Sequence, residues 1–147
     1  MDDDITHQPG TELDHLKIRS QSDLQRMWEL LMRPLGFTST SVWVTFIGSD
    51  DRPTRFLVEI AESEHLPDPP EVAHLFDLLE QLCADEGPGT SVAFLVTRPG
   101  RDRVNAFDRD MATRLRTGAR HSSVRCHPIH VANDLAVRAV TPDDLAA

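Results

Sequence analysis

The sequence predicts a three-layer α/β domain, in which a mixed sheet of about five strands carries helices on both faces. The segment Ser91–Thr97, SVAFLVT, is apolar at both sets of alternating positions, which is typical of a central strand covered by helices on each side. Strand-like and helix-like segments follow one another in the order α-β-β-α-β-α-β-β. A chain of 147 residues is long enough to bury a core as one domain.

The first expected helix begins at Ser22, because Ser22–Gln25 has the pattern of a capping box. It ends before Pro34, since proline and the following Gly36 do not continue a helix. The apolar stripe that we expect to face the core consists of Leu24, Met27, Trp28 and Leu31.

A β-hairpin is expected next. The segments Ser41–Ile47 and Arg55–Ile60 are rich in β-branched and aromatic residues, and the turn-forming sequence GSDDRPT joins them. A helix then starts after Asp68 as its N-cap and stops at the Gly-Pro-Gly of residues 87–89. Its buried face includes Cys83, which we interpret as a small core residue.

The central strand ends at a Pro-Gly break, which leads into an arginine-rich loop. Asn105 is a suitable N-cap for a helix that we expect from Ala106 to Arg116, and Asp108 lies in its first turn. The next strand, Ser123–Val131, contains Pro128, which indicates an edge strand or a bulge. A short strand over residues 135–140 and a helical turn after residue 141 complete the fold.

The domain organisation follows from composition. Residues 1–20 are polar, begin with an acidic run and are expected to form a flexible tail, whereas residues 21–147 form a single α/β domain. The tail has no apolar segment of the kind that a secretory signal needs, and the longest apolar runs have the length of strands. Two cysteines, Cys83 and Cys126, favour free thiols in a reducing compartment. The sequence therefore predicts a cytoplasmic protein without a membrane contact.

Charge is unevenly distributed along the chain. The net charge of −9 disfavours general binding to nucleic acid. Residues 1–97 hold 6 basic and 18 acidic side chains, whereas residues 98–138 hold 9 arginines and 4 aspartates. Two interpretations remain open: the oppositely charged halves pair with each other or with a second copy in a homodimer, or the arginines form an anion-binding surface.

The order of these elements is similar to that of a known family. A hairpin, a helix, a central strand that ends at a proline loop, a capped helix and two more strands resemble the JAMM/MPN metalloprotease-like fold over roughly residues 40–145, and in particular the RadC-like domain of bacteria. The resemblance implies a loop of the form His-x-His-Pro, followed by a serine and an aspartate at the start of the next helix. The two histidines and the aspartate bind zinc in that family, and a glutamate near the hairpin acts as general base.

The chain departs from this motif at most of its functional positions. The loop proline matches Pro99, the serine position holds Asn105, and the metal-binding aspartate matches Asp108. The histidine positions fall on Thr97 and Arg98, and no acidic residue stands between Leu30 and Gly48 to act as general base. One carboxylate beside arginines cannot hold a zinc ion, which needs about three protein ligands. The resemblance therefore implies a degenerate member of the family.

Two sets of candidate site residues remain. A weak anion site would use backbone amides and guanidinium groups of the loop after the central strand, from Arg98, Gly100, Arg101, Arg103 and Asn105. A rearranged zinc site would use Asp108, His121, Cys126 and His130. Cys126 and His130 would share one face of a regular strand, with His127 on the other. A nucleophilic pair of Cys126 with a histidine is a further alternative.

The preferred prediction is a binding or interaction module without catalysis, without a cofactor and with an unknown protein partner or small anion. No catalytic residues are assigned. The alternative is a divergent zinc-dependent hydrolase. A third hypothesis is a small assembly subunit that dimerises through a sheet edge or through its charged halves.

Overall fold

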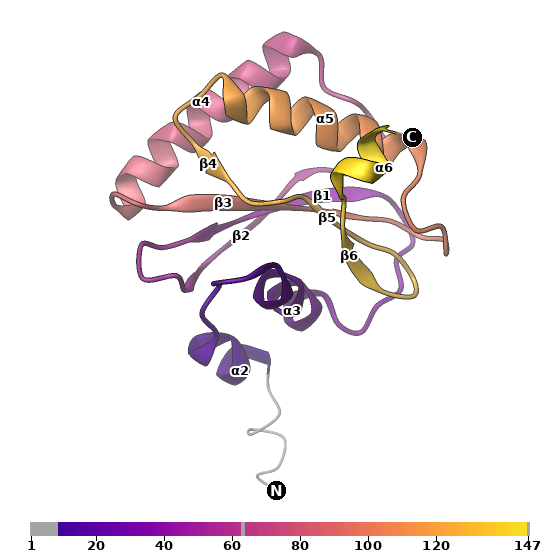
Figure 1. Ribbon diagram of the computed structural model, residues 1–147, viewed down its shortest axis with the longest axis horizontal. Helices are drawn as coiled ribbons and strands as arrows, with labels where there is room; N and C mark the ends of the chain where they lie inside the picture. Colours follow the sequence, from indigo (N-terminus) through magenta and orange to yellow (C-terminus); the bar gives the residue numbers. More distant parts are fainter. Residues whose placement is uncertain (1–8, 63, 147) are drawn as a thin grey trace, which may run out of the picture.

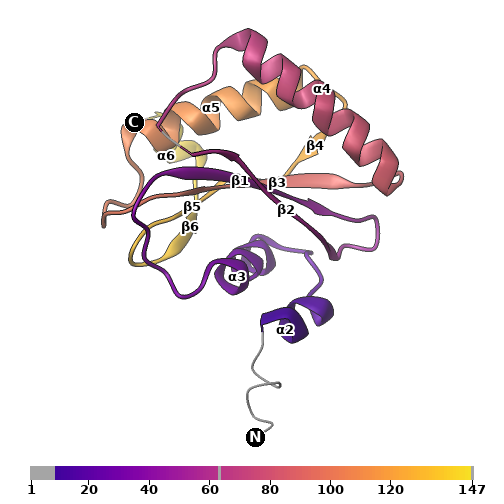
Figure 2. The ribbon, with the colours of Figure 1, turned by 180° about the vertical axis from the view of Figure 1, so that it is seen from behind.

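A computed structural model describes residues 9–62 and 64–146, and it has the predicted three-layer architecture. A mixed sheet lies between a layer of α2 and α3 and a layer of α4, α5 and α6 (Figures 1 and 2). The helices are α2 (Pro9–His15), α3 (Gln21–Met32), α4 (Pro69–Glu86), α5 (Ala106–Arg120) and α6 (Pro142–Ala146). The strands are β1 (Ser41–Ile47), β2 (Pro53–Ala61), β3 (Ser91–Thr97), β4 (Arg125–Cys126), β5 (His130–Ala132) and β6 (Val137–Ala139).

The strand β3 occupies the centre of the sheet, as its sequence predicts. The strand order is β2-β1-β3-β5-β6, with β4 also paired to β3. All seven residues of β3 are buried. Val92, Phe94 and Val96 contribute to the core under α4 and α5, whereas Ala93 and Leu95 contribute to the core against α3. Alternate side chains of one strand thus join the two cores of the domain.

The segment before α3 is more ordered than the expected tail. Residues 9–15 form α2, and Ile18, which is 6% exposed, is part of the core against α3. The N-cap of α3 is Ser20 and not Ser22: its side chain accepts a hydrogen bond from the backbone N–H of Asp23 at 3.1 Å. Residues 1–8 of the predicted tail lie outside the described residues.

The N-terminal caps of the two helices on the other face agree with the sequence. Asp68 caps α4 and Asn105 caps α5, each as part of a capping box. The helix α5 continues to Arg120, four residues beyond its expected end. Within this extension lies Gly118, where an added Cβ would come within 2.5 Å of Val72. Close packing of α5 on α4 therefore requires glycine at this position.

The expected strand over residues 123–131 is divided by a one-residue bulge. Val92 pairs with Cys126, an offset of 34 residues, whereas Leu95 pairs with His130, an offset of 35. One extra residue is therefore inserted within the segment 127–129. The prediction of an edge strand agrees with β4, for which the only pairing among the described residues is with β3, but not with β5, which lies between β3 and β6. The prediction of a bulge is confirmed. Pro128 fits there because it has no N–H to donate to a ladder.

This bulge changes which side chains share a face. Cys126 lies opposite Val92 and packs on the core under α4 and α5. His130 lies opposite Leu95, whose side chain belongs to the core against α3. The expectation that Cys126 and His130 share a face is therefore wrong, because the inserted residue inverts the alternation of the strand.

None of the helices in residues 9–62 and 64–146 is both long enough and apolar enough to cross a membrane.

Candidate functional site

A buried ion pair joins the end of the central strand to the start of α5. Arg98 is 4% exposed and Asp108 is fully buried. The Nε of Arg98 lies 3.0 Å from each carboxylate oxygen of Asp108, and its Nη2 lies 2.7 Å from Oδ2. Arg98 follows directly on β3, and Asp108 is in the first turn of α5. The pair therefore fixes the helix start against the carboxyl end of the sheet.

The remaining donors of Arg98 hold the intervening loop. Its Nη2 donates to the carbonyl oxygen of Asp102 at 2.7 Å, and the same oxygen accepts a bond from the side chain of buried Asn133 at 2.8 Å. Asp108 also accepts a hydrogen bond from the backbone N–H of Asn105 at 2.9 Å, while Asn105 accepts from the N–H of Asp108 at 2.9 Å. Arg98 and Asn105 thus serve the loop itself.

The backbone amide of Gly100 is bound by a carboxylate of the same chain. Its N–H donates to Oδ2 of Asp134 at 2.8 Å, and Oδ1 of Asp134 accepts from the N–H of Phe37 at 3.1 Å. These two backbone hydrogen bonds, with Arg101 and Arg98 nearby, lower the pKa of Asp134 below its usual value. The position that the sequence offers to an external anion is therefore filled by Asp134.

The five residues of the predicted anion site divide into two groups. Arg98, Gly100 and Asn105 make the internal hydrogen bonds described above, so their donors are directed at groups of the chain itself. Arg101 and Arg103 are exposed. An external anion that contacts this loop would therefore bind to the side chains of Arg101 and Arg103.

The alternative zinc ligands are not brought together. Asp108 is near the first residue of α5 and His121 follows its last, so the rise of the helix separates them by about 20 Å. Cys126 and His130 lie on opposite faces of the sheet because of the bulge. Across the described part of the chain, no group of three or more His, Cys, Asp or Glu side chains could hold a metal ion. The structure thus does not form the site that the zinc alternative requires.

Two histidines and a serine form a polar cluster on the α3 face of the sheet. The Nε2 of His127 lies 2.7 Å from the hydroxyl of Ser91, which is buried. His130 is fully buried, and its Nδ1 lies 3.0 Å from the carbonyl oxygen of Pro128. Because a carbonyl only accepts, Nδ1 carries the proton. The Nε2 of His130 has no hydrogen-bond partner among the described atoms.

Both imidazoles favour their neutral form. Burial lowers the pKa of His127, and the nearby Arg125 lowers it further, against an opposing effect of Asp51. Burial also lowers the pKa of His130; the hydrogen bond to Pro128 opposes this, and His127 adds to it. Sequence reasoning missed this cluster, because it depends on the bulge placing both histidines on one face.

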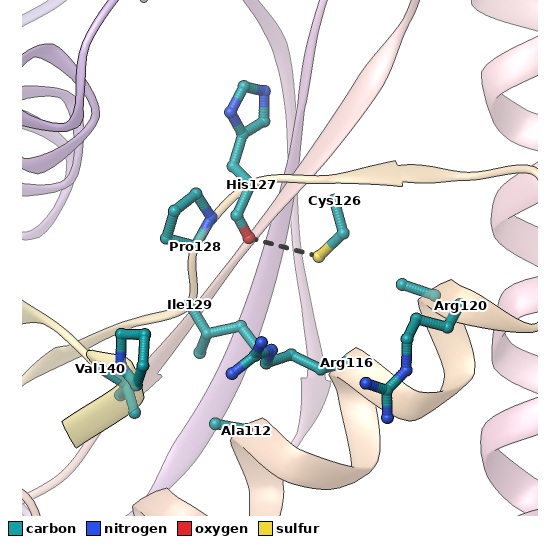
Figure 3. Close-up of a pocket in the computed structure, with 10 residues that line it drawn as sticks. Ala112, Arg116, Arg120, Cys126, His127, Pro128, Ile129 and Val140 are labelled. Atoms are coloured by element: carbon teal, nitrogen blue, oxygen red, sulfur yellow. Dashed lines mark hydrogen bonds between the residues drawn. The ribbon is translucent and has the colours of Figure 1, made fainter. Parts of the chain in front are cut away.

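A cavity of about 390 Å³ lies on the other face, beside the second half of α5 (Figure 3). Residues from α5, the bulge and the chain around α6 line it: Ala112, Arg116, Ala119, Arg120, Cys126, His127, Pro128, Ile129, Val140 and Pro142. In Figure 3 the Cys126 thiol points toward α5, whereas the His127 imidazole points away from it. Sequence reasoning did not single out Arg116 and Arg120, because this lining comes from elements that are separate in the sequence.

Cys126 is not arranged as a nucleophile. Its Sγ lies 3.4 Å from the backbone oxygen of His127, and the imidazole of His127 contacts Ser91 instead. Burial raises the pKa of the thiol from its ordinary value of 9.0 to about 12, against a smaller opposite effect of Arg116. A nucleophilic pair needs a base within hydrogen-bond reach and a thiolate, and neither condition is met here.

Two further hollows flank α4. One, of about 770 Å³, is a groove between α4 and α5 that includes Phe76 and Gly118. The other, of about 500 Å³, lies between α4 and β2 and includes Ile60 and the exposed Leu78. Neither combines two neighbouring arginines with an apolar floor as the cavity beside α5 does.

Removing one partner of the buried ion pair should destabilise the fold strongly, because the other charge is left buried without a counter-charge. Asp108→Asn leaves the charge of Arg98 buried and uncompensated, and we expect it to lower the free energy of unfolding by about 3–5 kcal/mol. Urea titration of D108N, R98M and the double variant R98M/D108N measures the coupling. The double variant should lose less than the sum of the single changes, and simple additivity would contradict the role given to the pair.

The histidine cluster should make stability fall in mild acid. A folded-state pKa below the ordinary 6.5 means that the unfolded chain binds more protons, so this stability is complete above pH 6.5 and is lost as the pH falls through the folded-state values. The loss is at most about 1.4 kcal/mol per pH unit for each histidine. Urea titrations at about pH 7.5 and about pH 5 measure it.

His130→Asn is the informative variant, because the amide can replace the Nδ1 donor but does not titrate in this range. We expect it to reduce the loss of stability between the two pH values. His74→Gln, at an exposed position of α4, is the matched control and should leave the loss unchanged. An unchanged loss in H130N would show that His130 does not contribute.

Cys126 should resist alkylation in the folded protein. With the pKa of the thiol raised from 9.0 to about 12, the thiolate fraction at about pH 8 falls roughly a thousandfold. We therefore expect iodoacetamide to label Cys126 at least about 100-fold more slowly in the native protein than in urea, as followed by peptide mass spectrometry. Equal rates in the two states would contradict the burial of this thiol.

Comparison with known proteins places no constraint on these assignments. No protein-family model matches the chain, and no curated protein matches it either.

Proposed function

We propose that this chain is a non-catalytic binding module built on a RadC-like, MPN-like scaffold. The observation that carries the proposal is the ion pair of Arg98 and Asp108, which lies at the carboxyl end of the central strand, where α/β folds usually place their ligands. In the resembled family, the aspartate at the position of Asp108 binds zinc. In this chain a guanidinium group is bound to that carboxylate instead.

The pair leaves no place for a metal ion on this carboxylate. Both oxygens of Asp108 lie within 3.0 Å of nitrogen atoms of Arg98, and Oδ2 also accepts the backbone N–H of Asn105. The positive charge of the guanidinium repels a cation. A fixed positive charge thus replaces the cation that the resembled hydrolases use, but it cannot activate a water molecule as a metal does.

A binding role remains for such a scaffold. The loop still presents the exposed Arg101 and Arg103, and the residues from 98 to 138 keep their excess of arginine over aspartate. We therefore propose a small anion or an acidic protein surface as partner, which includes a second copy of the chain, in the cytoplasm of a bacterium. The alternative, a divergent zinc hydrolase, has no specific observation in its favour, since its four ligands are dispersed.

Metal analysis tests the proposal directly. Protein purified without chelator and dialysed against zinc should retain well below about one zinc per chain by elemental analysis, because the only carboxylate at the expected position is bound to Arg98. Asp108→Asn and, as a matched control, Asp110→Asn on the same helix should leave the zinc content unchanged. About one zinc per chain that D108N removes and D110N retains would overturn the proposal.

A further inference from the structure

The cavity beside the second half of α5 combines an apolar floor with two free charges. Three of its apolar lining residues are at most 7% exposed: Ala112, Ile129 and Val140. Ala119, Pro128 and Pro142 complete the apolar lining. The residues of the bulge form one wall of the cavity, so the inserted residue of the strand shapes it.

The two arginines of the cavity have no counter-charge among the side chains that the structure describes. Arg116 and Arg120 are both exposed, and within the described ranges neither makes an ion pair. The one hydrogen bond of Arg120 in those ranges goes from its Nη2 to the hydroxyl of Thr117 at 3.4 Å. No acidic residue is among the described residues that line the cavity. Like charges one helical turn apart repel each other, and an anion between them would remove that cost.

This differs from the loop after the central strand. There, Asp108 and Asp134 already satisfy Arg98 and the amide of Gly100. Beside the cavity, Arg116 and Arg120 extend from consecutive turns of α5 and both line it, and Figure 3 shows the guanidinium group of Arg116 next to Ile129. Arg116 and Arg120 therefore offer positive charge at the other end of the helix, beside an apolar lining that the exposed Arg101 and Arg103 of the loop are not shown to share.

We propose that this cavity binds a small amphipathic anion, with its apolar body on Ala112, Ile129 and Val140 and its carboxylate or phosphate group on Arg116 and Arg120. A volume of about 390 Å³ is in the range of small-molecule sites, which are mostly apolar with a few placed polar groups. Guanidinium groups bind carboxylate and phosphate through paired hydrogen bonds. The ligand is held without a covalent bond, since Sγ of the half-buried Cys126 contacts the backbone oxygen of His127, whose imidazole contacts Ser91 instead.

The cavity adds a ligand class and a location to the proposed binding function, on which this role rests. It uses none of the residues around Arg98 and Asp108, so the two can fail separately. Retention of zinc would overturn the absence of catalysis and leave the cavity as it is. Failure of the cavity to bind the probes below would leave the metal result unaffected.

Isothermal titration calorimetry with defined probes tests the cavity. We expect octanoate and octyl phosphate to bind, octylamine and inorganic phosphate to bind at least about tenfold more weakly, and the stronger of the first two to identify the anionic group. Removal of both charges in R116Q/R120Q should weaken binding by about tenfold for each arginine, because each charge-assisted hydrogen bond that is lost contributes on that scale.

Two further variants separate the cavity from general charge effects. Arg114→Gln removes the same charge from an exposed position of α5 that borders a different groove, and it should bind octanoate like the unchanged protein. Ala119→Leu fills the cavity and should weaken binding although both arginines remain. Circular dichroism confirms that each variant is folded. The proposal is wrong if octylamine binds as well as octanoate, if R116Q/R120Q binds as R114Q does, or if no octanoate binding is detected at about 10 mM.

Discussion

The structure depends on one buried interaction, the ion pair between Arg98 and Asp108. Removing two charges from water is expensive, and such a pair offsets the cost only when its geometry is good and its other hydrogen-bonding groups are satisfied. Here both conditions hold, since Nη2 of Arg98 also donates to a loop carbonyl and Asp108 also accepts the N–H of Asn105. The pair thereby joins the most buried strand of the sheet to the helix that follows it, and it fixes the loop between them.

The same pairing of polar groups determines where a ligand can bind. Around the carboxyl end of β3, carboxylate and carbonyl oxygens of the chain accept the hydrogen bonds of Arg98 and of the backbone amide of Gly100. At the far end of α5, Arg116 and Arg120 have no carboxylate partner in the described part of the chain, and an apolar floor lies next to them. Internal contacts occupy Arg98 and the amide of Gly100 at the position that general fold rules favour, whereas an apolar cavity with two arginines lies at the other end of the same helix.

Local patterns predict the architecture well. The strand Ser91–Thr97 is recognisable because apolar character on both faces is typical of a strand buried between two layers of helices. The caps Asp68 and Asn105 are recognisable because capping depends on residues three positions apart. The site is less predictable, because a run of arginines does not reveal that a buried aspartate binds Arg98 and leaves its neighbours exposed. The lining of the cavity comes from separate elements that only the tertiary fold brings together, so no local pattern identifies it.

The one-residue insertion within 127–129 has a consequence for how this chain can diverge. It inverts the alternation of side chains between two halves of what would otherwise be one strand. Cys126 and His130, four positions apart, therefore lie on opposite faces of the sheet. A substitution at one of these positions then alters the packing of one core and not of the other. The face with Cys126 can therefore change to fit a different ligand while the face with His130 keeps its packing. Deletion of the inserted residue would move the side chains of one half of the strand to the opposite face.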